Sequence, residues 1–333
     1  MRGPAPHFGT IIFYYFIKGL RKGMFKFRRP VGLFLCGGGA LGAWQSGVLA
    51  GLVKQGLHFD AVAGFSIGSL NGAAYCYNKT GELGQIWHNM KPSKILSLKP
   101  RFYNMPLELY QQDGGSLVNK VGFFVQNRLS RFTLFTNKPV LDFLNGWLAR
   151  SGPQFPRNIK FYAISHAVEM KLPYIVRFDG STQSHNLSFV DALMASCSIP
   201  MIFPPVPVEE HGRRYNLVDG GVIGIATINL SLFEGCRTVI MVGNSRPEDL
   251  DYPSVGPFGY FERKARRMLA IHTQKIYESR VFMKSEPDVY LLKPPLDLGL
   301  NLLEFDGAKC GRAYDIGEAE AKHFLDNLNR SAA

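Results

Sequence analysis

Two strand–glycine turn–helix units follow one another near the start of the sequence, and this repetition is its strongest constraint on fold. The apolar run Val31–Leu35 leads into GGGALG and then into a helical stretch over 41–54. The shorter run Ala61–Phe65 leads into GFSIG and a second helical stretch over 67–77. Alternation of buried strands and helices joined by tight turns is typical of a parallel α/β sheet.

Later segments extend the same pattern. Strand signals recur at 161–168, 174–178, 238–242 and 289–292, and a further helix is expected around 316–328. A long amphipathic helix is expected between the last two strands, with an apolar face made of Phe261, Ala265, Met268, Leu269, His272 and Ile276. Its basic residues Arg263, Lys264, Arg266 and Arg267 are expected to face solvent. The sequence predicts one α/β domain over 31–333.

Residues 92–158 interrupt the alternation with six prolines among short aromatic pieces, which predicts a cap or insertion on the sheet. Its aromatic residues are candidates for lining an acyl channel, and simple packing of the cap is the alternative; they are Phe102, Tyr103, Tyr110, Phe123, Phe124, Phe132 and Phe135.

Residues 1–30 form a basic and aromatic amino-terminal segment. Its apolar run over 8–17 is too short to cross a bilayer, which takes about twenty residues. A cationic cluster follows this run, as in an anchor that lies on an anionic membrane surface. Its members are Lys18, Arg21, Lys22, Lys26, Arg28 and Arg29. The alternatives are a frayed leader and a segment packed on the domain.

Charge and cysteine content narrow the partners and the compartment. The net charge of +12 favours anionic partners. The sequence shows no nucleic-acid recognition module, so we do not expect the protein to bind nucleic acid. Five scattered cysteines without a CxxC pair argue against a zinc site or a disulfide framework. We therefore expect a cytoplasmic protein with reduced thiols, peripheral on the membrane if the basic segment anchors it.

The glycine-rich turn after the first strand admits two readings. Gly37, Gly39 and Gly42 match GxGxxG, and Asp60 follows at the distance of a ribose-binding acid, as in a dinucleotide-dependent oxidoreductase. Alternatively, the amides of Gly37, Gly38 and Gly39 gather at a helix amino terminus and stabilise an oxyanion.

The GFSIG turn favours the second reading. A GxSxG sequence between a strand and a helix is the nucleophile elbow, in which Gly64 and Gly68 relieve crowding and Ser66 stands exposed at the helix head. A serine nucleophile needs a base. His272 and His323 are the histidines placed late enough for a Ser–Asp–His order, but both are better explained by packing.

Asp219 is the better candidate for the base, because it ends a strand and is followed by Gly220 and Gly221, which allow another backbone to approach. The alternative reading of an isolated Asp-Gly-Gly sequence is a simple β-turn.

In this order, GGGALG, GFSIG, ASCSIP (195–200) and DGG resemble the motifs of the patatin-like phospholipases, over about residues 31–225. The resemblance implies a three-layer α/β/α fold with a mainly parallel central sheet and a cap insertion. It further implies a lipid acyl hydrolase with a Ser66–Asp219 dyad, an oxyanion hole of Gly37–Gly39 amides, and no metal or organic cofactor. The substrate would be a lipid ester of the phospholipase A or lysophospholipase type.

One position departs from the family pattern. Leu41 stands in the glycine-rich block where the family usually has Arg or Lys. The substitution is the main support for the alternative of a catalytically weak, membrane-associated module.

Overall fold

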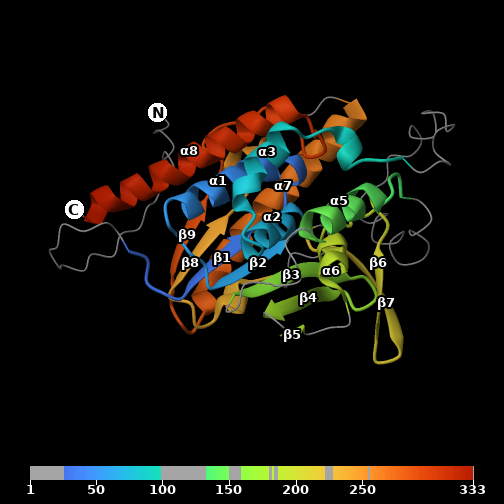
Figure 1. Cartoon of the computed structure of the whole chain (residues 1–333), viewed down its shortest axis with the longest axis horizontal. Helices are drawn as coiled ribbons and strands as arrows, with labels where there is room; N and C mark the ends of the chain where they lie inside the picture. Colours follow the sequence, from blue (N-terminus) through green and yellow to red (C-terminus); the bar gives the residue numbers. More distant parts are fainter. Residues whose placement is uncertain are drawn as a thin grey trace, which may run out of the picture.

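The computed structural model describes residues 26–98, 133–149, 159–179, 182–183, 187–221, 228–253 and 256–332. These residues form a sheet of nine strands flanked by helices (Figure 1). The strands are β1 (Val31–Leu35), β2 (Ala61–Phe65), β3 (Lys160–Ala167), β4 (Leu172–Asp179), β5 (Thr182–Gln183), β6 (Val206–Glu210), β7 (Arg213–Asp219), β8 (Thr238–Val242) and β9 (Asp288–Leu292). The helices are α1 (Gly42–Lys54), α2 (Ile67–Cys76), α3 (Leu83–His88), α5 (Lys138–Ala149), α6 (Phe189–Ser196), α7 (Gly256–Glu278) and α8 (Gly307–Ala332).

The sheet is parallel at its centre and antiparallel at one side. Its main path runs β5-β4-β3-β2-β1-β8-β9, in which β3, β2, β1, β8 and β9 are parallel. Strands β4 and β7 both pair antiparallel with β3, and β6 pairs with β7. The carboxyl ends of β1, β2 and β8 therefore meet at one sheet edge, where ligands bind in α/β proteins.

Helices cover both faces of this sheet. The connections β1-α1-β2 and β2-α2-β3 cross the sheet in one direction, whereas β8-α7-β9 crosses it in the other. Because such crossovers are right-handed, α1 and α2 lie on one face and α7 on the opposite face. Every residue of β1, β2 and β8 is buried, as two covering layers require. This confirms the three-layer α/β/α fold with a mainly parallel sheet.

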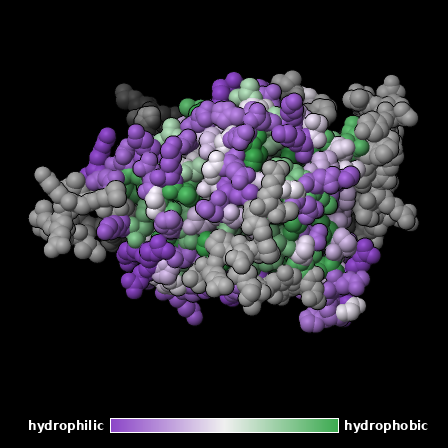
Figure 2. All heavy atoms as spheres, in the orientation of Figure 1, coloured by the Kyte–Doolittle hydropathy of each residue, from purple (hydrophilic) through white to green (hydrophobic). Residues whose placement is uncertain are grey.

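Small residues allow α8 to lie directly against α1 (Figure 1). A Cβ on Gly47 would lie 1.9 Å from the carbonyl oxygen of Tyr314, and one on Gly317 would lie 2.0 Å from that of Trp44. On the face of the molecule that Figure 2 shows, the coloured surface is largely hydrophilic, with hydrophobic side chains in separated areas. The long carboxyl-terminal helix α8 thus belongs to the helical layer that contains α1.

The prediction for the two faces of α7 was wrong at one residue on each face. Phe261, expected in the core, is 39% exposed, whereas Arg266, expected in solvent, is 3% exposed. The Arg266 guanidinium donates to Glu262 Oε1 (2.6 Å), to Asp249 Oδ1 (3.3 Å) and to the carbonyl oxygen of Leu300. The hydropathy pattern of the helix cannot predict that Arg266 is buried. The burial depends on two carboxylates and one carbonyl oxygen, which lie in three different segments.

The described parts of the 92–158 insertion belong to the domain. Backbone amides of Leu134 and Phe135 donate to the carbonyl oxygens of Met201 and Ile202, and α5 packs against α6. The rings of Phe135 and Phe203 lie 6.3 Å apart. Of the aromatic residues proposed for an acyl channel, the other six lie outside the described residues.

The last residues of the amino-terminal segment also dock on the domain. Phe27 packs edge-on against Tyr290 at 5.6 Å, and Arg28 pairs with Asp288 at 2.8 Å. Arg29 pairs with Asp60. Two cations expected to face a membrane therefore have protein partners; the rest of the segment, 1–25, lies outside the described residues. In the described part of the chain, no helix is long and apolar enough to span a bilayer.

Candidate active site

Ser66 occupies a sharp turn between β2 and α2. Its backbone has φ 54° and ψ −135°, a conformation that side-chain-bearing residues rarely adopt. The turn places Ser66 at the amino terminus of α2, whose aligned peptide dipoles favour negative charge. The strained turn at a strand–helix junction is the geometry expected of a nucleophile elbow.

The two glycines of GFSIG are required by backbone contacts. A Cβ on Gly64 would lie 2.5 Å from the carbonyl carbon and oxygen of Gly68, and one on Gly68 would lie 2.1 Å from the carbonyl oxygen of Leu35. Neither position can hold a side chain unless the turn opens. The structure therefore gives a steric reason for both glycines beside Ser66.

The ASCSIP segment joins this turn to the strand that carries Asp219. The Ser66 amide donates to both the carbonyl oxygen and Oγ of Ser196, each at 3.0 Å. Ser196 Oγ in turn donates to the carbonyl oxygen of Ile164 at 2.7 Å, and the Asp219 amide donates to that of Ser198 at 2.9 Å. One short segment thus fixes both halves of the proposed dyad.

The Ser66 side chain lies beside the Asp219 carboxylate, close enough to lower the pKa of this carboxyl group as a hydrogen-bond donor. Asp219 is 2% exposed, and its Oδ1 accepts from the Gly221 amide at 2.7 Å. Burial raises the pKa of Asp219 to about 6, although the hydrogen bonds from Ser66 and Gly221 oppose this increase. A carboxylate with this pKa is ionised at neutral pH and still basic enough to take a proton.

The Asp-Gly-Gly sequence packs closely against the elbow. A Cβ on Gly220 would lie 2.9 Å from the carbonyl oxygen of Ile164, and one on Gly221 would lie 2.6 Å from the Phe65 ring. Phe65 directly precedes Ser66, so these contacts bring β7 against the turn. The predicted close approach of another backbone is therefore found at Gly220, whereas Gly221 makes room for a side chain, the Phe65 ring.

The glycine-rich turn lies beside Ser66. A Cβ on Gly37 would lie 3.0 Å from Ser66 Cβ. The turn continues into the short 3-10 helix η1 (Gly39–Leu41), where Gly39 has φ 54° and the Ala40 amide donates to the carbonyl oxygen of Leu302 at 2.8 Å. The proposed oxyanion turn and the proposed nucleophile are thus in contact.

The backbone carbonyl oxygens of this turn, from Cys36 to Gly38, all accept hydrogen bonds. The Cys36 carbonyl oxygen accepts from Gln45 Nε2 (2.9 Å) and Asn244 Nδ2 (3.0 Å), and that of Gly37 accepts from Asn244 Nδ2 (3.1 Å). The Gly38 carbonyl oxygen accepts from the Leu41 amide at 3.1 Å. Within the described ranges, the amides of Gly37–Gly39 donate to no protein group. Three adjacent free amides are suited to an anion.

Neither late histidine takes the place of Asp219. His272 is buried in α7, where burial lowers the pKa of its imidazole to about 4 and its Nε2 has no partner among the described residues. His323 is exposed on α8 and contacts Asn327 at 3.1 Å. His272 is packed as expected from the sequence, whereas His323, also expected to pack, is exposed.

Asp60 contradicts the dinucleotide reading. It directly precedes β2, so it lies at the amino edge of the sheet, whereas the glycine turn follows β1 at the carboxyl edge. Its carboxylate accepts from the Val31 amide at 2.7 Å and pairs with Arg29. A ribose-binding acid belongs at the carboxyl edge, beside the glycines.

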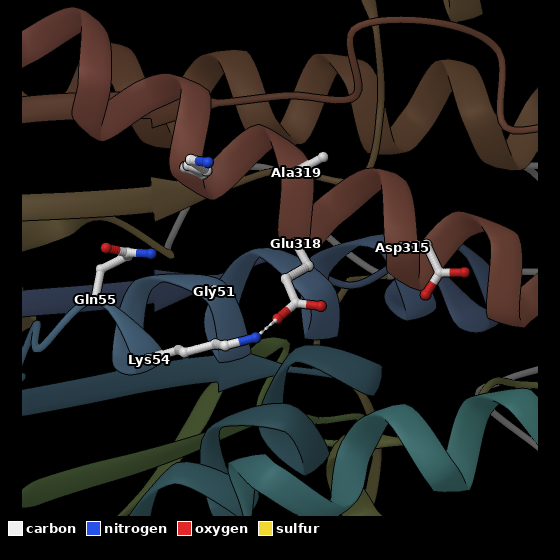
Figure 3. A pocket seen from close by; sticks show the side chains of 7 residues that line it. Gly51, Lys54, Gln55, Asp315, Glu318 and Ala319 are labelled. Carbon is white, nitrogen blue, oxygen red and sulfur yellow. Dashed lines mark hydrogen bonds and ion pairs between the residues drawn. The ribbon is translucent and has the colours of Figure 1, made fainter.

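A surface groove between α1 and α8 lies away from these residues (Figure 3). It adjoins the last turn of α1, about 18 Å along the helix from the glycine turn, and the Lys54–Glu318 ion pair crosses it at 3.0 Å. Its lining combines charges of both signs with an open surface, unlike an apolar lipid pocket. Among the described residues, no group of three or more His, Cys, Asp or Glu could hold a metal ion.

Sequence reasoning missed the amides that hold the glycine turn. Gln45 and Asn244 are 0% and 2% exposed, and Gln45 Oε1 also accepts from Asn71 Nδ2 at 2.9 Å. A signal for Asn244 was present, because it comes just after the buried strand β8, at the edge where strands deliver functional residues. No comparable pattern marks Gln45, which lies within a helix.

Comparison with known proteins points to one family. The family model described as patatin-like phospholipase matches residues 33–228. The chain is 25% identical to triacylglycerol lipase 5 of Saccharomyces cerevisiae over 62% of the chain and 27% of that protein. It is 24% identical to human patatin-like phospholipase domain-containing protein 6, and 25% identical to lysophospholipase nte1 of Aspergillus fumigatus. Each alignment covers 90% of the chain but only 20% and 18% of these relatives.

The chain therefore spans about a fifth to a quarter of the length of these relatives. Among solved structures, VipD from Legionella pneumophila aligns with a TM-score of 0.43 and 12% identity, over 90% of this chain and 67% of that one. The family match covers more than half of the chain and contains all four sequence blocks. The chain belongs to the patatin-like phospholipase family.

Proposed function

We propose that this chain is a serine lipid acyl hydrolase of the phospholipase A or lysophospholipase type, working through a Ser66–Asp219 dyad. The observation that carries the proposal is a serine on a strained elbow beside a buried carboxylate, with one short segment, 196–198, hydrogen-bonded to the backbone of both residues. Family membership supports lipid ester hydrolysis, and the names of the relatives include both lipases and lysophospholipases.

In the proposed reaction, Ser66 Oγ attacks the ester carbonyl carbon while Asp219 takes the hydroxyl proton. The carbonyl oxygen becomes an oxyanion that accepts hydrogen bonds from the amides of Gly37, Gly38 and Gly39. Asp219 then gives its proton to the leaving alcohol, which leaves an acyl group on Ser66. Asp219 next takes a proton from water, the water oxygen attacks the acyl carbon, and the fatty acid leaves as Ser66 Oγ is reprotonated.

Leu41 is compatible with this chemistry. Its side chain is 1% exposed and belongs to the hydrophobic core, so it presents no charge to the site. The proposed oxyanion donors are backbone amides, which do not depend on the side chain at this position. The absent cation bears on recognition of an anionic headgroup and not on ester cleavage.

The test is hydrolysis of a medium-chain p-nitrophenyl ester by the wild type, Ser66→Ala and Asp219→Ala. We expect both variants to lose at least about 10⁴-fold in kcat. Ser93→Ala, an exposed serine in the 3-10 turn over 92–94, is the matched control and should retain full activity. Wild-type rates in Ser66→Ala would refute the dyad.

The same assay with anionic vesicles tests a second part of the proposal, which is that the chain acts at a membrane surface reached through its basic amino-terminal segment. We expect vesicles to stimulate hydrolysis at low salt and less so at high salt. Absence of activity under every condition would favour the alternative of a non-catalytic, membrane-associated module.

A further inference from the structure

Asn244 is a buried amide that adjoins the glycine turn and that the proposed chemistry does not use. It follows β8 by two residues and is 2% exposed. A Cβ on Gly38 would lie 2.6 Å from Asn244 Cβ, so the side chain lies directly against the turn. A polar group this well buried needs a structural or functional reason.

The hydrogen bonds of Asn244 use only its nitrogen. Nδ2 donates to the carbonyl oxygens of Cys36 at 3.0 Å and Gly37 at 3.1 Å. Because both partners are acceptors, the nitrogen must be the atom that faces them. Oδ1 has no hydrogen-bond partner among the described residues. The carboxamide therefore contributes two donated bonds, both to the same turn, and leaves its own acceptor unused.

These two bonds fix the direction of the amides on the other side of the turn. In a planar trans peptide the carbonyl of one residue and the amide of the next point in opposite directions. Holding the Cys36 and Gly37 carbonyls toward Asn244 therefore turns the Gly37 and Gly38 amides away from it. Two successive amides that point to the same side form an anion-binding concavity.

The Gly37–Gly38 peptide depends on Asn244 more than its neighbours do. The Cys36 carbonyl has a second donor in Gln45 Nε2, and the Gly38 carbonyl is held by the Leu41 amide within the turn. The Gly37 carbonyl has Asn244 Nδ2 as its donor. Loss of this donor would free one peptide to rotate while the rest of the turn stayed in place.

We propose that Asn244 is a positioning residue for catalysis, whose carboxamide nitrogen holds the Cys36 and Gly37 carbonyls so that the following amides are preorganised to receive the oxyanion. The inference rests on the proposed function of the Gly37–Gly39 turn. Asn244 does not touch the substrate in this account; it acts through the two peptides that do.

The test compares Asn244→Leu and Asn244→Asp with Ser245→Ala. Leucine keeps the approximate volume and removes the donor, and the aspartate oxygens would face two carbonyl oxygens. Ser245 is the matched control, since it is equally buried but bonds to Thr273 Oγ1 at 3.3 Å. Removal of one oxyanion donor costs about 10²–10³ in kcat, and we expect a loss of at least about 100-fold in both Asn244 variants.

Further readouts separate positioning from a merely structural role. KM and the acid limb of the pH profile should be unchanged in Asn244→Leu, because the substrate pocket and Asp219 are untouched. The backbone amide signals of Gly37 and Gly38 should shift in the NMR spectrum of the variant, and those of Ser66 should not. In the wild type, the Asn244 side-chain amide protons should exchange slowly with solvent, a measurement that does not require the variants to fold.

The outcomes distinguish this proposal from the proposed function. An active wild type that requires Ser66, together with an Asn244→Leu variant of unchanged kcat, would overturn the positioning role alone. Rapid exchange of the Asn244 amide protons would also overturn it. A wild type whose hydrolysis survives Ser66→Ala would refute the proposed function, and the positioning role would fall with it.

Discussion

The buried charge of Asp219 is expected to lower the stability of the protein and to be required for its proposed chemistry. The substitution Asp219→Asn should therefore raise stability and abolish activity. The carboxyl group is 2% exposed and faces no cationic side chain among the causes that set its pKa. Asparagine keeps the shape and retains an oxygen that can accept from the Gly221 amide. The substitution removes the buried charge, which is the feature that costs free energy.

The size of this cost follows from the pKa. Burial raises the pKa of Asp219 to about 6, compared with about 3.9 in an unfolded chain. Because the native state holds the proton more tightly, stability decreases as the pH rises from about 4 to 6, and the full cost applies above pH 6. A pKa difference of about 2 corresponds to about 3 kcal/mol. For 333 residues this equals about 4 °C in Tm.

The assay is thermal and denaturant unfolding of the wild type and Asp219→Asn at pH 8 and pH 4. We expect the variant to be more stable by up to about 3 kcal/mol at pH 8, with little difference at pH 4, and to lack hydrolase activity. Asp326→Asn, an exposed aspartate on α8, is the control and should have the same stability as the wild type at both values. A variant that is no more stable than the wild type at pH 8 would refute the desolvation argument.

Three further results are expected. The kcat/KM of the wild type should fall as the pH decreases through about 6, since protonated Asp219 cannot act as a base; a flat profile from pH 5 to 8 would contradict this role. Gly39→Ala should lower both activity and the free energy of unfolding, by roughly 1–3 kcal/mol, because φ is 54° and the new Cβ would lie 2.1 Å from the Leu302 carbonyl oxygen. Arg266→Met should destabilise the fold by roughly 3–5 kcal/mol by leaving Glu262 buried without its cation. Denaturant titration should show that most of this loss is recovered when Glu262→Leu is added.

The sequence predicted the parts of the fold that local patterns encode. The limits of β1, β2 and β8 agree with the apolar runs, because a strand buried on both faces reads as a continuous hydrophobic segment. The glycine turn and the GFSIG turn are also where they were expected, since a Cβ on any of their glycines would lie less than 3.0 Å from a neighbouring atom. Local steric demands leave a signature that a single sequence can display.

Long-range polar contacts leave no such signature. Arg266 was assigned to solvent because a charge in an amphipathic helix usually faces water, and its burial depends on partners up to 34 residues away. Asn244 is brought to the glycine turn by the order of strands in the sheet, which the sequence does not state. Asp60 shows the opposite case, in which a local pattern is misleading. Its distance in sequence from the glycines matched that of a ribose-binding acid, but the sheet topology places it at the edge opposite to the glycine turn.

The most direct test of the central claim is to map the residue modified by a fluorophosphonate, which forms a stable adduct with an activated serine. The account predicts a single adduct on Ser66 in the wild type, found by mass spectrometry of the digested protein, and loss of labelling in Asp219→Asn. An adduct on another serine, or equal labelling of Ser66 in Asp219→Asn, would contradict the Ser66–Asp219 dyad.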